Sequence, residues 1–108
     1  MSTQDDIVAT LTELVIETLP DATMREMYGG TVIELVKDTP KSRIGGFYAY
    51  ADHVSLELAE GKFLDDPGGL LEGSGKARRH VKLYGVEDVT GRNCAGFLVA
   101  AAARKAQP

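Results

Sequence analysis

The segment whose residue types and spacing most resemble a binding site is glycine-rich and runs into basic residues. It reads GLLEGSGKARRHVKL and spans residues 69–83. A phosphate-binding P-loop follows the pattern G-x-x-x-x-G-K-[ST] and opens a helix. Here Leu70 stands at the first glycine position, Ala77 follows Lys76, and a strand pattern comes next. A Walker-type site is therefore excluded. Two interpretations stay open: a looser anion-binding nest of backbone amides over 73–76, and a turn that only directs the following strand.

Three basic residues follow at two-residue spacing. In a strand, Arg78, His80 and Lys82 would project from one face. If this strand neighbours the segment carrying His53 and Glu57, the Glu57 carboxylate lies across from the basic residues and pairs with Arg78 or Lys82. An exposed pair of this kind contributes only ~0.2–1 kcal/mol, so a solvated sheet face is one interpretation and a surface for a small ligand or protein partner is the other. The candidate ligand-binding residues are Tyr48, His53, Glu57, Gly75, Lys76, Arg78, His80 and Lys82.

The sequence contains no defined motif for a metal site or for catalysis. His53, His80 and Cys94 lack the short spacings of zinc sites, and Cys94 falls on an apolar stripe where we expect a small buried side chain. His80 could act as a general base only if the fold brings Glu57 within hydrogen-bond reach. The interpretation favoured is a protein without catalytic residues. Acids near the N-terminus could hold a hard or borderline cation, with the ligand set unknown. These acids are Asp5, Asp6, Glu13, Glu17 and Asp21.

The spacing of apolar residues predicts the helices and strands that position these side chains. An apolar stripe of helical period predicts a first helix up to Leu19, started by a capping box of Thr3 and Asp6. Apolar residues at two-residue period predict strands at 31–38, 44–52, 53–59 and 78–84. A final helix is expected with Thr90 as its cap. Arg79 falls on the inward row of the last strand, and we expect its side chain to reach an acid in the preceding loop.

The connection between the last two strands is long, from about Ala59 to Lys76. Loops of this length without secondary structure are uncommon, and they are usually functional or held by packing of their own residues. Apolar residues in this loop predict that it is ordered. They are Phe63, Leu64, Leu70 and Leu71.

The order of helix, strands and helix predicts an α+β fold in one domain over residues 1–108. We expect an N-terminal helix, an antiparallel meander sheet of about five strands and a C-terminal helix. Both helices would pack on one face of the sheet and leave the other face wet. The strand at 31–38 is partly apolar and could be an edge, so both a monomer and a homodimer stay open.

Charge and composition narrow the possible partners. The net charge is -4 and the isoelectric point is about 5.1, which is unfavourable for nucleic-acid binding through counterion release. The first thirty residues carry a net charge of -5 and the remainder a net charge of +1. No apolar run approaches the ~20 residues that cross a bilayer, so no membrane association is expected. A single cysteine and no signal-like segment favour the cytoplasm.

Several segments resemble the YdhG-like family of small domains of unknown function. They are LPDATMREMYGG, GFYAYADHVSLEL, DDPGGLLEGSGKARRHVKL and GVEDV, and together they span most of the chain. The resemblance implies a compact fold of a helix, an antiparallel sheet and a closing helix. Some relatives are described as frataxin-like iron chaperones, which would point to iron and to the acids of the first helix. The expected function is weak iron handling or partner binding in a non-catalytic cytoplasmic domain. The alternative is binding of an anion or phosphorylated small ligand at the glycine loop and basic strand, conceivably with enzymatic activity.

Overall fold

The computed structural model describes residues 2–106, and its first element is the predicted helix α1, Thr3–Thr18. The capping box begins one residue earlier than the sequence predicts. The Ser2 hydroxyl accepts a hydrogen bond from the Asp5 amide at 3.1 Å, and the Asp5 carboxylate accepts one from the Ser2 amide at 3.2 Å. Thr3, the predicted cap, is therefore the first residue inside the helix. One stripe of α1 is buried and anchors the helix on the sheet: Ile7, Leu11 and Val15.

Five antiparallel strands form one meander sheet, in which each strand pairs with the next along the chain. They are β1 (Thr23–Met27), β2 (Gly30–Glu34), β3 (Arg43–Ala49), β4 (Val54–Leu58) and β5 (Arg79–Leu83). The sequence left open that residues 31–38 could form an edge. Strand β1 pairs with the outer side of β2, so β2 is not an edge strand. That strand also ends early, because the register of β2 and β3 shifts at Glu34 and Asp38 takes a positive φ of 58°.

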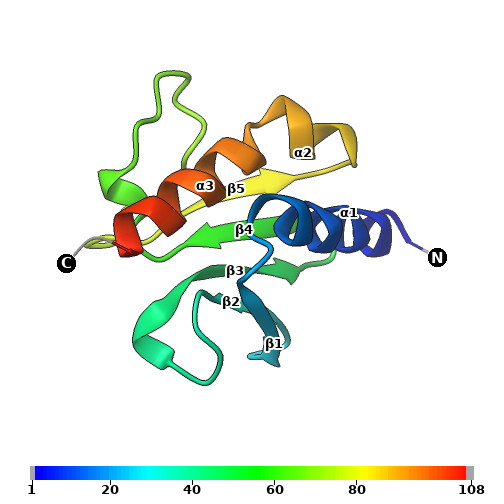
Figure 1. The fold of residues 1–108 in the computed structure, drawn as a ribbon. Coiled ribbons are helices and arrows are strands. Elements are labelled where there is room, and N and C mark those ends of the chain that lie inside the picture. The colour runs from blue at the N-terminus through cyan, green and yellow to red at the C-terminus, as the bar shows by residue number, and fades with distance from the viewer. Residues whose placement is uncertain (1, 107–108) are drawn as a thin grey trace.

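Three helices pack on one face of the sheet, as predicted for an α+β fold (Figure 1). The single C-terminal helix expected from the sequence is divided into α2 (Glu87–Gly91) and α3 (Cys94–Lys105). Asn93 separates them because its φ of 58° cannot continue a helix. Thr90 therefore lies within α2 and does not cap the last helix, so that prediction is wrong. No helix among residues 2–106 is long and apolar enough to span a membrane.

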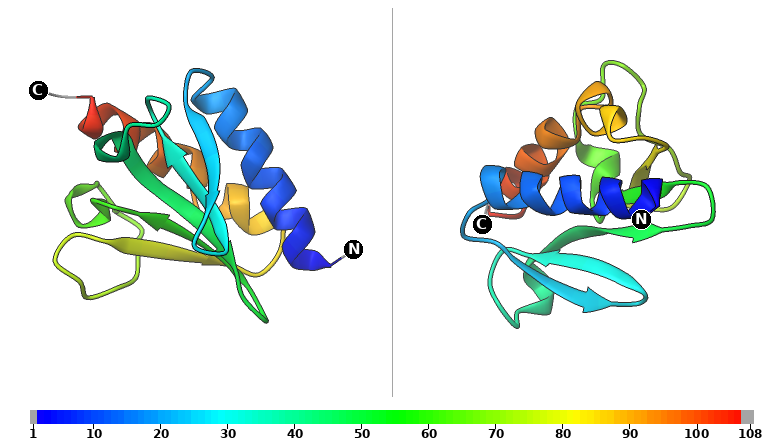
Figure 2. Two further views of the ribbon diagram at one scale, coloured as in Figure 1. Left: turned by 90° about the horizontal axis from the view of Figure 1, so that it is seen from below. Right: turned by 90° about the vertical axis from the view of Figure 1, so that its right-hand side faces the viewer.

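The core lies between the helices and the inward rows of the strands. Phe47 of β3, Leu56 of β4 and Val81 of β5 are register partners and are all buried under the helices. In the right-hand view of Figure 2 the helices lie on one side of the sheet, and the β1–β2 hairpin lies at the end of the molecule away from α2. No α-helix formed by residues 2–106 covers the opposite side of the sheet, and we call that side the open face.

The long loop between β4 and β5 is ordered by its own contacts, as predicted. Leu64, Leu70 and Leu71 pack against the core. The Asp66 carboxylate accepts hydrogen bonds from the amides of Leu70 at 2.8 Å and Leu71 at 2.9 Å. Phe63 was expected to anchor the loop in the core, but its side chain is about half exposed and lies 4.3 Å below the Arg104 guanidinium. Its contact is thus a surface cation–π interaction and not a core anchor.

Candidate ligand-binding face of the sheet

The register of the sheet places most of the predicted site residues together on the open face. Glu57 of β4 lies opposite His80 of β5, and Ser55 lies between Tyr48 of β3 and Lys82 of β5. Cross-strand partners in an antiparallel sheet share a face, and the alternate residues of these strands are buried under the helices. Tyr48, Glu57, His80 and Lys82 therefore project from the open face, as the two-residue period predicts.

Glu57 makes the ion pair that the sequence predicts. The Arg78 guanidinium donates to the Glu57 carboxylate at 3.0 Å, and 55% of the Arg78 side chain is exposed. Lys82 was the other predicted partner, and its register position is opposite Ser55 instead. On its other side, β5 forms an isolated bridge through His80 to Glu72 of the long loop, with N–O distances of 2.8 and 2.9 Å. His80 thus lies between two acidic residues across the sheet.

His53 forms a cluster with aromatic residues at one end of the open face. Its ring stacks on Tyr50 with centroids 4.9 Å apart and lies 5.7 Å from the ring of Tyr84. Its Nδ1 lies 2.6 Å from an Asp52 carboxylate oxygen. A carboxylate only accepts hydrogen bonds, so Nδ1 is the donor. This hydrogen bond is the main cause that lowers the pKa of Asp52 below its usual value of 3.8.

A hollow of about 420 Å³ lies on the open face beside these residues. Three of the chain's four tyrosines line it, together with two arginines and the Glu57 carboxylate. Its lining residues are Tyr28, Val32, Arg43, Gly45, Tyr48, Tyr50, Glu57, Ala59 and Arg78. Ligand cavities in proteins span roughly 300–1,000 Å³, so the hollow has room for a small organic molecule.

Glycines of β2 and β3 let the Tyr48 ring form the floor of this hollow. A Cβ atom on Gly30 would lie 2.8 Å from Tyr48 Cε1, and one on Gly46 would lie 3.2 Å from the Tyr48 hydroxyl. The ring therefore occupies the space of the missing side chains and lies along the sheet. Burial is the main cause that raises the pKa of Tyr48, and the Glu57 carboxylate adds to the rise.

Arg43 is fixed at the hollow by a buried acid. Glu34 is only 1% exposed, and its carboxylate accepts a hydrogen bond from Arg43 Nε at 2.8 Å. The same carboxylate accepts from the Asp38 amide at 3.2 Å and lies 3.9 Å from Arg25. The Glu34 carboxylate is the main cause that raises the pKa of Arg43, and the Tyr28 hydroxyl contributes a smaller rise. Arg43 thus stays charged with its guanidinium held in one place.

Five of the eight predicted site residues do not line the hollow. His53, His80 and Lys82 lie elsewhere on the open face, and the other two lie in a loop. Gly75 and Lys76 are exposed in the loop before β5, and neither lines the hollow. The Gly75 carbonyl accepts a hydrogen bond from Arg79 at 2.8 Å, and the Arg78 carbonyl accepts one from the same guanidinium nitrogen at 2.7 Å. Arg79 was expected to pair with an acid of the loop. Its observed partners are backbone carbonyls, which hold the loop against β5.

The acids of the first helix are not gathered into a metal site. Among residues 2–106 there is no group of three or more His, Cys, Asp or Glu side chains that could hold a metal ion. Asp5 takes part in the capping box at the helix start. Cys94 is fully buried, as predicted, and burial raises the pKa of its thiol to about 12. The thiol is therefore protonated at neutral pH and is not a ready nucleophile or metal ligand.

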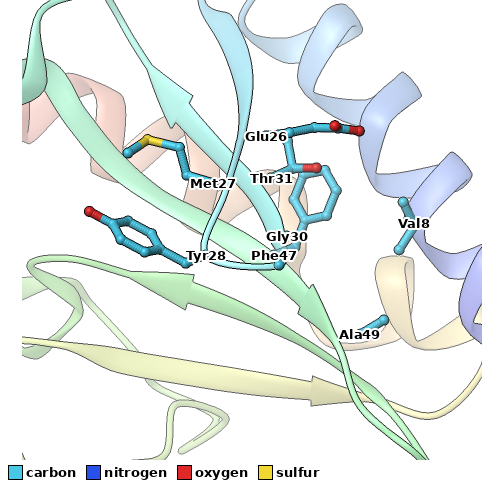
Figure 3. Close-up of a pocket in the computed structure, with 9 residues that line it drawn as sticks. Val8, Glu26, Met27, Tyr28, Gly30, Thr31, Phe47 and Ala49 are labelled. Carbon is cyan, nitrogen blue, oxygen red and sulfur yellow. The ribbon is translucent and has the colours of Figure 1, made fainter.

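A second hollow, of about 550 Å³, lies between α1 and the β1–β2 turn (Figure 3). Val8, Phe47 and Ala49 form its apolar side, and Glu26 is its one ionisable side chain besides Tyr28. Tyr28 points away from Glu26 in the close-up. This hollow therefore lacks the paired arginines that the open face provides.

The sequence alone did not indicate Tyr28, Glu34 or Arg43 as site residues. Tyr28 belongs to the turn pattern MYGG, and Glu34 lies at a strand end, so both are more readily explained as structural residues. The signal that could have found Arg43 is its spacing from Tyr48, but the strand bulge at Glu34 obscures that alternation. Comparisons with protein-family models, with curated proteins and with solved structures gave no match.

Proposed function

We propose that the protein is a non-catalytic binding domain that holds a small organic anion on the open face of its sheet. The observation that supports this most is the hollow in which three tyrosines meet two arginines, each arginine fixed by a glutamate. Tyrosine supplies apolar area with a polar end, and arginine supplies a charged group that pairs well with carboxylates and phosphates. We also propose that the protein acts in the cytoplasm, as the sequence favours.

The arginines keep donors for a ligand. A guanidinium has five N–H groups. Arg43 uses Nε for Glu34, and Arg78 uses one Nη for Glu57. The Tyr28 hydroxyl interacts with Arg43 as well. Each guanidinium still has N–H groups beyond these contacts, so each can donate to an anion without giving up its glutamate. Lys82 projects from the same face and adds positive charge nearby.

A titration of isotope-labelled protein with phosphorylated metabolites and small carboxylates tests this proposal. Saturable shifts of amide resonances are expected in β3, β4 and the start of β5. Arg43→Gln and Arg78→Gln should each weaken binding about tenfold or more, since a hydrogen bond to a charged group contributes about 1.5–3 kcal/mol.

Arg104→Gln is the matched control for these variants. Arg104 also pairs with a glutamate, Glu60, at 2.9 Å, but it belongs to α3 on the covered side of the sheet. Its substitution should leave ligand affinity unchanged. Absence of saturable shifts, or an equal loss of affinity in Arg104→Gln, would contradict the proposal.

A second proposal is weak iron handling, which follows from the resemblance to the YdhG-like family. The observation in its favour is that Asp6, Glu13 and Glu17 are exposed and recur at helical spacing on α1. Glu13 and Glu17 lie on neighbouring turns, and carboxylates are suitable ligands for a hard or borderline cation. This surface is on the helix side of the sheet, so binding there is separable from binding on the open face.

A further inference from the structure

We infer that the anion taken by the open face is a nucleoside monophosphate, with its base stacked on Tyr48 and its phosphate held by Arg43 and Arg78. This inference rests on the proposed function and names the ligand class. It follows from the shape of the hollow, from the unusual position of Tyr28 and from the separation of aromatic and cationic groups along β3.

The floor of the hollow is shaped for a planar group. Tyr48 lies along the sheet over Gly30 and Gly46, so one face of its ring is covered by backbone and the other is turned to the hollow. An aromatic ring held flat in this way is the surface on which proteins stack nucleobases, and every base has a face that fits it. A small aliphatic carboxylic acid or a sugar phosphate has no planar ring to use this floor.

Tyr28 is held in a position that folding alone does not favour. It precedes Gly29 in the two-residue turn between β1 and β2, and both residues have positive φ, 56° and 77°. Such turns favour Asn-Gly, and a bulky residue at positive φ is strained. The Tyr28 side chain is also 77% exposed. Strain and exposure in one aromatic residue are explained if the ring has a binding role, here as a wall of the hollow.

Two of the tyrosines and both arginines of the hollow lie at opposite ends of β3. Tyr48 lies near the end of this strand and Tyr50 just follows it. The Tyr28 turn lies beside them, and the Tyr28 hydroxyl extends toward Arg43. Arg43 begins the same strand, and Arg78 lies just before β5, which begins at the same end of the sheet. A ligand that matches this arrangement has a planar base at one end and a phosphate at the other.

The polar groups of the hollow also suit a nucleotide. Glu57 lies on the row next to Tyr48 and uses one carboxylate oxygen for Arg78, so its other oxygen can accept a hydrogen bond from a ribose hydroxyl between base and phosphate. The net charge of -4 is unfavourable for a long polyanion. A single nucleotide has few negative charges, so the protein repels it less than a nucleic-acid strand.

Calorimetry with three matched ligands tests the inference: adenosine monophosphate, ribose 5-phosphate and adenosine. Adenosine monophosphate should bind about tenfold or more tightly than ribose 5-phosphate, because only it can stack a base. Equal affinity of these two would overturn the nucleotide inference and leave the proposed anion binding intact. No binding of any phosphate ligand would overturn the nucleotide inference, and the proposed anion binding would fall with it if the small carboxylates also failed to bind. A short oligoribonucleotide that binds at least tenfold more tightly than adenosine monophosphate would show that a strand is the occupant and overturn the inference.

Variants of the tyrosines separate binding from folding. Tyr48→Leu should remove the preference for adenosine monophosphate over ribose 5-phosphate. Tyr28→Asn should raise the urea midpoint, since asparagine suits the turn, while it weakens adenosine monophosphate binding several-fold. Tyr84→Leu is the control, because Tyr84 is about half exposed and does not line the hollow. A Tyr28→Asn protein that keeps full affinity would contradict the role given to Tyr28.

Discussion

Single residues on the open face take their properties from one close partner each. The Asp52 side chain is largely exposed to solvent, yet the hydrogen bond from His53 lowers its pKa. Arg43 is held by Glu34, and Arg78 is held by Glu57. Residues that would be mobile on an isolated strand thus have fixed positions and charges. This is what a binding surface needs, because ordering side chains on binding costs free energy.

Asp52 gives a prediction at this scale. Its lowered folded pKa means that the interaction with His53 stabilises the fold above the unfolded value of 3.8 and is lost as the pH falls through the folded pKa. A carbon-detected NMR titration of Asp52 should therefore have a midpoint below 3.8. His53→Phe keeps a ring between Tyr50 and Tyr84 but has no donor, so the midpoint should return toward 3.8. An unchanged midpoint in this variant would show that His53 is not the cause.

Among the elements, the loop before β5 shows how a segment without regular structure is made rigid. Two amides donate to the Asp66 carboxylate. Glu72 forms an isolated antiparallel bridge with His80 on the outer side of β5. The Lys62 amide donates to the Ala77 carbonyl at 2.9 Å and closes the base of the loop. The loop also covers part of the edge of β5, which protects that edge from pairing with another chain.

Substitution of Asp66 tests this account of the loop. Asp66→Ala leaves two backbone amides without their acceptor and should destabilise the protein by about 1–3 kcal/mol in urea unfolding. The neighbouring Asp65 is exposed, so Asp65→Ala is the control and should change stability by less than about 0.5 kcal/mol. Equal losses in the two variants would mean that the general charge of the loop matters and not the Asp66 hydrogen bonds.

At the scale of the whole molecule, the sheet and its helices lie between two different surfaces. Exposed acids lie along the outside of α1, whereas the paired arginines and tyrosines lie on the open face. Charges that are far apart and exposed to water interact little at physiological salt, because the Debye length is about 8 Å. The two surfaces should therefore act independently.

Substitution of the α1 acids tests this independence and the iron proposal together. In a Glu13→Gln, Glu17→Gln double variant, anion affinity at the open face should change by less than about twofold, since the charges are screened. If the protein handles iron through α1, an anaerobic ferrous titration followed by calorimetry should show weakened binding in the same variant. Ferrous binding that is equally strong in the variant and in the parent protein would contradict iron handling by these acids.

Several predictions from the sequence are confirmed because they depend on local periodicity. The inward and outward rows of β4 and β5 follow from alternation, and a one-residue slip would put Leu56 and Val81 in water. The face shared by Glu57, Arg78 and His80 was therefore predictable, as was the Glu57–Arg78 pair once the strands were taken as neighbours. The strand at β1 and the break at Asn93 were not predicted, because neither TMREM nor TGRNC carries a strong periodic signal.

The sequence by itself determined the α+β order, the buried stripe of α1 and the alternation that divides covered from open rows. These follow from helix and strand geometry, which acts over a few neighbouring residues. Only the tertiary structure decided that Tyr28, Arg43 and Tyr48 surround one hollow over Gly30 and Gly46. That arrangement depends on which strands pair, at which register and around which bulge, and pairing is set by burial across the whole sheet.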